Sequence, residues 1–352
     1  MNRRTFLKTA AGFSLAAPLL LRDSFAAVPP PTGLAFGGEQ FSSLVADSLR
    51  VAPVVGSPRF ETWWRDRYAT DPAAQSAFGA GSFETMLERT TRTLQQERDP
   101  QRRAMLELEF AKKLHRLVKN LIPRFSLQRG FEFTLTVSRL ERQCLLQSTL
   151  IAGMLERCGV RAGVVMVWRN QLLAVSNLGH AVTLLKLADG RDALIDASDP
   201  TPLMRHSGLL GWDAARRDYR FVAPRFALDD TIQGYTRIGD TSPLTTAGFE
   251  PLGFAYLRSQ FYFYRGERVT GGFMGSPPTR VGLEASAAFL ETAERTETRN
   301  PLAVYVLGHV YRRLERMPEA RARYERAHAL YVRFGFVPNG MADAYKRWVR
   351  GA

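Results

Sequence analysis

Residues 143–168 read QCLLQSTLIAGMLERCGVRAGVVMVW, and this stretch decides the fold. It predicts an apolar helix that begins close to Cys144 and stops at Gly159. A valine-rich run over 162–168 follows and predicts a buried strand. A helix that leads into an antiparallel sheet is typical of the α+β class.

Three reactive side chains lie in and just beyond this stretch. Cys144 heads the helix, His180 begins a second strand that we predict over 181–187, and Asp196 lies on a third over 193–197. A thiol, an imidazole and a carboxylate are the groups that a cysteine acyl-transfer site needs. We therefore predict catalytic roles for Cys144 as nucleophile, His180 as proton shuttle and Asp196 as the group that orients the imidazole.

The turn between these two strands decides which carboxylate meets His180. A two-residue turn at Asp189-Gly190 pairs His180 with Asp199 and puts Asp196 on the opposite face. A three-residue loop with Gly190 in the left-handed region pairs 180 with 198, so that Asp196 lies diagonally across from His180. Local sequence leaves both registers open.

The approach to Cys144 is predicted to be extended or loop-like over 124–137, where FEFTLTV alternates. Ser138 and Glu141 have the spacing of a capping box, which would put Cys144 in the second helical turn. The backbone N–H of Cys144 is the expected oxyanion donor, and Gln143 is a second candidate.

The N-terminus carries an export pattern. Arg3-Arg4, an apolar run over 9–21 and small residues ending at Ala27 resemble a bacterial twin-arginine signal. The apolar run is too short and interrupted to favour a spanning helix. We expect residues 1–27 to be a signal peptide, and the mature protein to be soluble, periplasmic or otherwise exported, without a transmembrane span.

Composition limits the other classes of function. The net charge of +14 and pI near 10.2 come mostly from arginines scattered through all segments of the 352-residue chain. No recognised nucleic-acid module accompanies them, so we expect no nucleic-acid partner. The five histidines show no HExxH motif and the two cysteines no CxxC, so we predict no metal and no cofactor. Cys144 and Cys158 lie roughly 21 Å apart along one helix, beyond disulfide reach.

The remaining chain is predicted to be mainly helical at both ends. Residues 28–123 form a helical lead-in that packs on the core, with helices over 39–52, 82–96 and 101–121. Residues 124–250 hold the core and an irregular extension after Pro200, with short strands at 219–222 and 231–237. Residues 251–352 form a helical domain, with helices near 254–267 and 281–295, two antiparallel helices within 301–334 and a final helix over 341–349.

Two resemblances follow from these residues. Leu307, Gly308, Tyr311, Ala320, Tyr324 and Ala327 have the spacing of one tetratricopeptide repeat. Cys144, then LIAGMLERCGVRAGVV, Gly179-His180-Ala181 and Leu194-Ile195-Asp196 resemble the core of the transglutaminase-like superfamily. That resemblance covers about residues 142–200 and implies a Cys-His-Asp triad with Asp196 rather than Asp199.

The resemblance implies two functions. The first is an exported cysteine enzyme that hydrolyses or transfers amide or peptide groups through a thioester. The alternative is a non-catalytic scaffold of the cell envelope that binds a peptide or an envelope protein through its repeat region.

Overall fold

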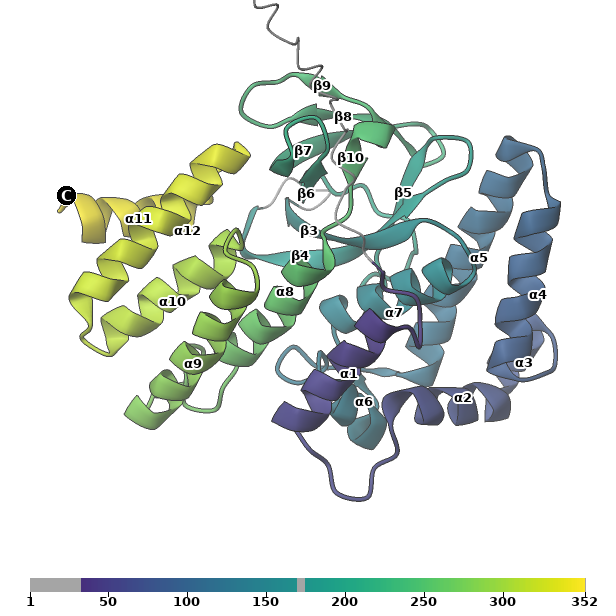
Figure 1. The fold of residues 1–352 in the computed structure, drawn as a ribbon, viewed down its shortest axis with the longest axis horizontal. Helices are drawn as coiled ribbons and strands as arrows, with labels where there is room; N and C mark the ends of the chain where they lie inside the picture. Colours follow the sequence, from purple (N-terminus) through teal and green to yellow (C-terminus); the bar gives the residue numbers. More distant parts are fainter. Residues whose placement is uncertain (1–32, 170–174, 352) are drawn as a thin grey trace, which may run out of the picture.

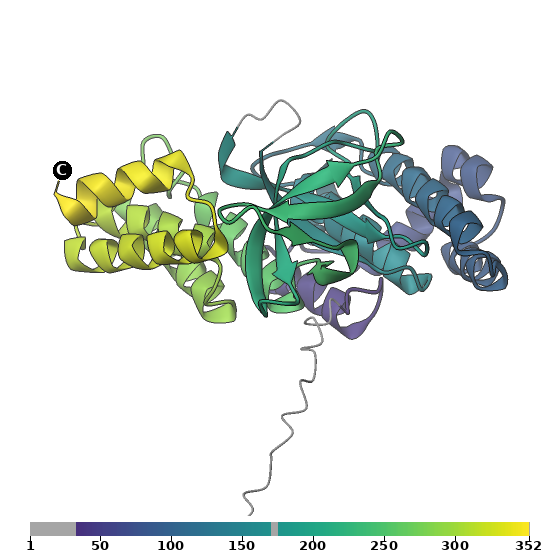
Figure 2. The ribbon, with the colours of Figure 1, turned by 90° about the horizontal axis from the view of Figure 1, so that it is seen from above.

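The computed structural model describes residues 33–169 and 175–351, so the predicted signal over 1–27 lies outside the described residues. An antiparallel β-barrel occupies the middle of the molecule (Figures 1 and 2). N-terminal helices lie at one end of the barrel and C-terminal helices at the other. The predicted α+β class is confirmed.

Within the described residues, six strands close the barrel in the order β6-β3-β4-β5-β8-β7, and β7 pairs back to β6. Alternate side chains fill its interior, among them Val165, Val182 and Leu194. The intervening residues Val164 and Met166 face the helices instead. The strands are β3 (Ala162–Arg169), β4 (Val175–Lys186), β5 (Asp192–Ile195), β6 (Gly208–Asp213), β7 (Asp218–Phe226) and β8 (Ile232–Arg237), with β9 (Pro243–Leu244) on β8 and β10 (Phe249–Glu250) on β6.

Helix α7 (Cys144–Arg157) packs on the outer face of β3 and β4. The predicted helix is confirmed, and Gly159 follows its end with a φ of 76°, in the left-handed region that favours glycine. Every residue from Cys144 to Leu155 is buried, because barrel strands and other helices surround α7 on all sides.

The predicted extended approach to Cys144 is wrong in part. A short parallel ladder joins β1 (Arg124–Phe125) to β2 (Glu141–Arg142), but helix α6 (Phe133–Arg139) lies between them. Its first residue, Phe133, packs against Phe41, Phe60 and Phe261, and this packing overrides the strand-like alternation. Ser138 lies inside α6, so the predicted capping box is also wrong.

The N-terminal helices agree with the sequence apart from α2 and α3, which were not predicted as separate helices. The segment ahead of α1 is joined to α7 by a hydrogen bond from the Phe36 N–H to the Gly153 carbonyl at 2.8 Å. Helix α5 also packs on α7. The helices are α1 (Glu39–Val51), α2 (Phe60–Thr70), α3 (Pro72–Phe78), α4 (Phe83–Gln96) and α5 (Pro100–Leu121).

The segment after Pro200 is more regular than predicted. The short strands expected near 219–222 and 231–237 belong to β7 and β8, and β6 was missed. Gly211 lets β6 approach its neighbour, because a Cβ there would lie 2.5 Å from the Phe249 ring. These strands close the barrel rather than form an extension.

The C-terminal helices form two consecutive packed pairs, α8 with α9 and α10 with α11. Gly308 on α10 faces Tyr324 on α11 so closely that a Cβ would lie 2.9 Å from its ring. The helices are α8 (Phe254–Glu267), α9 (Arg280–Thr296), α10 (Pro301–Arg313), α11 (Met317–Phe334) and α12 (Asn339–Tyr345), followed by a π-helical turn, Lys346–Arg350. Within residues 33–169 and 175–351, no helix combines the length and apolar character needed to span a bilayer.

Candidate active site

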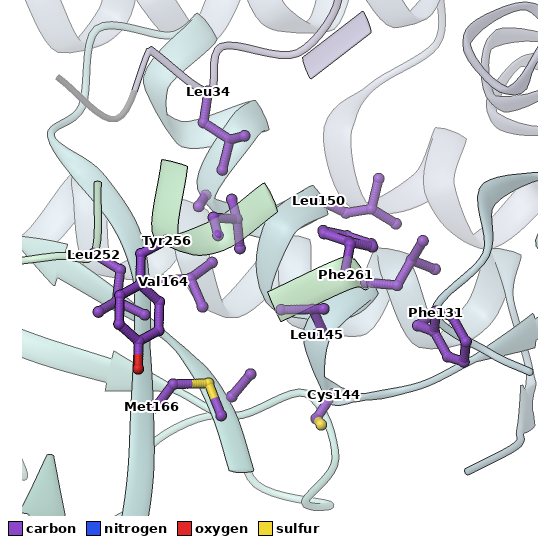
Figure 3. Close-up of a cluster of buried hydrophobic side chains, with 14 of the residues drawn as sticks. Leu34, Phe131, Cys144, Leu145, Leu150, Val164, Met166, Leu252, Tyr256 and Phe261 are labelled. Carbon is purple, nitrogen blue, oxygen red and sulfur yellow. The ribbon is translucent and has the colours of Figure 1, made fainter. Parts of the chain in front are cut away.

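Cys144 is the first residue of α7. The N-cap residue is Gln143, whose side-chain oxygen accepts a hydrogen bond from the Leu145 N–H at 3.4 Å. Figure 3 shows Cys144 at the edge of a buried apolar cluster, one residue before Leu145. A helix N-terminus carries partial positive charge, which favours a thiolate.

Strand β4 brings His180 to this thiol. Two hydrogen bonds hold β4 against α7: the Ser148 hydroxyl donates to the Ala181 carbonyl at 3.0 Å, and the Thr183 hydroxyl donates to the Ser148 carbonyl at 3.1 Å. His180 then lies close enough to Cys144 for its charge to act on the thiol.

The electrostatics of this pair favour a thiolate and an imidazolium. Burial acts to raise the pKa of the Cys144 thiol, but the charge of His180 and its hydrogen bond outweigh burial, so the pKa lies below its ordinary value. The Ala181 backbone and Tyr264 act in the same direction. Burial acts to lower the pKa of His180, but Cys144 and Asp196 raise it to about 10. Both changes stabilise the same charged pair.

Asp196 follows β5 and accepts hydrogen bonds from two histidines. Its Oδ2 lies 2.8 Å from His180 Nε2 and 2.9 Å from His206 Nε2, and its Oδ1 accepts from the Ser198 N–H at 2.9 Å. Burial opposes ionisation, but these hydrogen bonds hold the pKa of the Asp196 carboxyl well below its usual range. Because an ionised carboxylate only accepts, His180 donates to it through Nε2, and in the imidazolium the second proton is on Nδ1.

The register of the hairpin decides between the two aspartates. Lys186 pairs with Asp192, and the Leu187 N–H donates to the Arg191 carbonyl at 2.8 Å. This leaves a three-residue loop of Ala188, Asp189 and Gly190, and Gly190 has a φ of 86°. The longer of the two predicted loops is therefore the one that forms.

Asp199 lies in the turn that follows β5, three residues after Asp196. Its backbone carbonyl accepts from His115 Nε2 at 3.1 Å and from Lys119 Nζ at 2.6 Å. Its carboxylate accepts from the Thr201 hydroxyl at 3.2 Å. Asp196, rather than Asp199, contacts His180.

Two residues of the site were missed in the sequence. His206 precedes β6 in a stretch without periodicity, and only its residue type could have drawn attention to it. Tyr264 lies on α8, 120 residues after Cys144, and its hydroxyl oxygen is 3.6 Å from Cys144 Sγ. Nothing local in the aromatic run FYFY distinguishes Tyr264 from its neighbours.

Gln143 has the properties expected of an oxyanion donor. Its side chain is fully buried, and its Nε2 has no hydrogen-bond partner within the described part of the chain. A buried amide donor without a partner costs about 1–3 kcal/mol, so such a group is usually retained for a reason.

The described residues contain one group with the chemistry of metal ligands: His180, Asp196 and His206, whose ligand atoms all lie within 4.8 Å of one another. Both imidazole Nε2 atoms lie at hydrogen-bond distance from the same carboxylate oxygen. A divalent ion would require both nitrogens to lose their protons and face the ion. Hydrogen bonding alone accounts for this arrangement.

No family model matches the chain, and no curated protein matches it. Among solved structures, the chain aligns with a crystal structure of menin, whose title reports the binding site for Mixed Lineage Leukemia (MLL) protein. The alignment has 11% identity and a TM-score of 0.28, and it covers 91% of this chain and 75% of the menin chain. A similarity this weak carries no argument, so the function must be argued from the site itself.

Proposed function

We propose that this chain is an exported cysteine acyl-transfer enzyme of the transglutaminase-like type. The single observation that carries the proposal is a linked set of three groups. Cys144 begins a helix, its thiol pKa is lowered by His180, and His180 Nε2 lies 2.8 Å from Asp196 Oδ2. These are the features of an activated thiol nucleophile with an oriented base.

The reaction has two steps. The Cys144 thiolate attacks an amide carbonyl carbon, and the C–N bond breaks as protonated His180 gives its proton to the leaving amine. The product is a thioester on Cys144. His180, now neutral, removes a proton from water or from an acceptor amine, which attacks the thioester and restores the thiol. Asp196 keeps the imidazole in the productive tautomer throughout.

The arrangement of elements supports the papain-like or transglutaminase-like assignment. The nucleophile begins a buried helix, and the histidine and aspartate come from adjacent antiparallel strands that the helix packs against. The paired helices α8–α11, with the close contact of Gly308 and Tyr324, support the tetratricopeptide assignment and a peptide or protein partner. The export assignment rests on Arg3-Arg4 and the residues that follow.

The proposal is tested with a thiol-directed acyl probe on the purified protein, such as an activated thioester or ester. The wild type is expected to be labelled at Cys144, and Cys144→Ala to remain unlabelled. Cys158→Ala is the matched control, because burial raises the pKa of the Cys158 thiol to about 11 and it should not react.

Equal labelling of the wild type and Cys144→Ala would exclude the enzyme. The chain would then be a non-catalytic binding scaffold of the envelope, the alternative that the two packed helical pairs also support.

A further inference from the structure

Helix α8 belongs to the C-terminal helical region, yet it delivers a side chain to the nucleophile. The hydroxyl oxygen of Tyr264 lies 3.6 Å from Cys144 Sγ, within hydrogen-bond range for sulfur. The Tyr264 residue is 2% exposed and the Cys144 residue 6%. The contact is therefore made in a site from which water is largely excluded, where a hydrogen bond to a charged group is strongest.

The ring of Tyr264 has two close neighbours. The Arg268 guanidinium lies 4.1 Å from the centre of the ring, and the Phe131 ring centre lies 5.7 Å away. Arg268 is ion-paired to Glu267 at 2.9 Å, and Glu267 is fully buried. A ring fixed in this way keeps its hydroxyl in place without any reorganisation during a reaction.

The Tyr264 hydroxyl also stays protonated. Burial and the neighbouring Cys144 thiolate raise the pKa of Tyr264 well above its usual value, although Arg268 acts in the opposite direction. Beside a thiolate, a neutral phenol is a hydrogen-bond donor.

We propose that Tyr264 is a catalytic residue that donates a hydrogen bond first to the Cys144 thiolate and then to the oxyanion of the tetrahedral intermediate. The inference rests on the proposed acyl-transfer function. When Sγ attacks, a C–S bond forms and the carbonyl π electrons move to oxygen, which then lies about 2.6 Å from sulfur by ordinary bond geometry. A hydroxyl 3.6 Å from Sγ can donate to that oxygen when the carbonyl is bound with its oxygen on the Tyr264 side of the sulfur. No proton leaves Tyr264, and the C=O bond re-forms as the leaving group departs with a proton from His180.

Two reactions of the same thiol separate the two parts of this role. Alkylation by iodoacetamide needs the thiolate but passes through no oxyanion, whereas acylation by p-nitrophenyl acetate forms one. In Tyr264→Phe, acylation should fall by about 100-fold, the scale for losing one oxyanion donor. Alkylation measured well above the thiol pKa should stay within about threefold of the wild type.

Tyr256→Phe is the matched control. Tyr256 lies on the same helix, is fully buried, and its hydroxyl has no hydrogen-bond partner within the described residues. Removing that hydroxyl should leave both rates unchanged. A third protein with 3-fluorotyrosine at 264 keeps the ring and the hydroxyl, and should acylate at least as fast as the wild type.

Each other result has a distinct meaning. If Tyr264→Phe lost acylation and alkylation equally, the Tyr264 hydroxyl would only stabilise the thiolate, and the oxyanion role would be overturned. Faster acylation by Tyr264→Phe would show that the hydroxyl shields the thiol, and would overturn the proposal entirely, as would a fluorotyrosine protein as slow as the Phe variant. A wild type that is alkylated but never acylated would instead refute the acyl-transfer function itself.

Discussion

At the scale of single residues, Cys144 and His180 act as one charged pair. The His180 side chain is 27% exposed, so the pair meets solvent on one side and the buried carboxylate of Asp196 on the other. Neither residue has the pKa it would have alone, because each stabilises the charged form of the other. The pH dependence of the thiol should therefore reveal the pairing.

We expect a broad pH range in which Cys144 is reactive. The acid limb should lie below the pH at which an ordinary cysteine protonates, because the Cys144 pKa is lowered. With an amide substrate, the alkaline limb of acylation should lie near pH 10, where His180 loses its proton and can no longer protonate the leaving amine. Rates of alkylation and acylation across this range measure the two limbs.

His180→Ala serves as the control for this profile. Without the imidazolium, burial alone would raise the Cys144 pKa, and alkylation near neutral pH should fall by about tenfold or more. If the acid limb of Cys144 alkylation lay at the same pH in the wild type and in His180→Ala, the charged pair of Cys144 and His180 would be contradicted.

The two aspartates of the turn should differ sharply on substitution. Asp196→Asn removes the ionised acceptor of His180 Nε2, and we expect acylation to fall by about 100-fold or more. Asp199→Asn should be close to the wild type, because Asp199 contacts His115 and Lys119 through its backbone carbonyl. Steady-state acylation of both variants measures the difference, and similar losses would show that the carboxylate assignment is wrong.

At the scale of elements, the position of Cys144 depends on a close approach between two backbones. A Cβ on Gly130 would lie 2.3 Å from the carbonyl carbon of Arg142 and 2.8 Å from the Gln143 nitrogen. The loop after β1 is therefore pressed against the residues that precede the nucleophile. Phe131, the next residue in that loop, touches the ring of Tyr264.

Gly130→Ala should move the start of α7. The backbone must shift to admit the methyl group, and we expect the free energy of unfolding to fall by about 2 kcal/mol, together with slower acylation. Urea unfolding and the acyl probe measure the two effects. Gln128→Ala, at an exposed position of the same loop, should change neither. An unaltered Gly130→Ala protein would mean that this contact does not position Cys144.

Sequence alone predicted the elements whose evidence is local. Consecutive residues are enough to predict helix α7, its end at Gly159 and most of the helices at both ends of the chain. The hairpin register could be narrowed to two choices, because a turn of two or three residues permits only two pairings near Asp189-Gly190.

The elements that sequence missed depend on distant partners. Strand β6 is short and contains two glycines, and it is defined by pairing with β3 and β7. Helix α6 follows from the packing of Phe133 against rings from α1, α2 and α8. His206 and Tyr264 join the candidate site only after the barrel closes and α8 packs beside α7, and no spacing in the chain encodes that approach.

At the scale of the whole molecule, one apolar cluster contains residues from all three predicted segments, 28–123, 124–250 and 251–352. It includes Phe41 of the N-terminal helices, Leu150 of α7, Met166 of the barrel and Tyr331 of α11. The candidate site lies where these parts meet, since α7, β4 and α8 each contribute a residue. The helical ends are thus part of the structure that holds the site.

We therefore expect the protein to unfold in one cooperative transition, with Cys144 becoming freely reactive at the same midpoint. Leu302→Ala, at a fully buried residue in the first turn of α10 and far along the chain from Cys144, should lower the free energy of unfolding by about 2–5 kcal/mol. Because the cluster is shared, that substitution should shift the melting of the barrel and the exposure of Cys144 together, as measured by circular dichroism and thiol alkylation on heating. Val332→Ala, at a residue that is 55% exposed on α11, should shift neither. If the C-terminal helices melted first and left Cys144 protected, α8 would be dispensable for the site, and the contact of Tyr264 with the thiol would have no part in holding it.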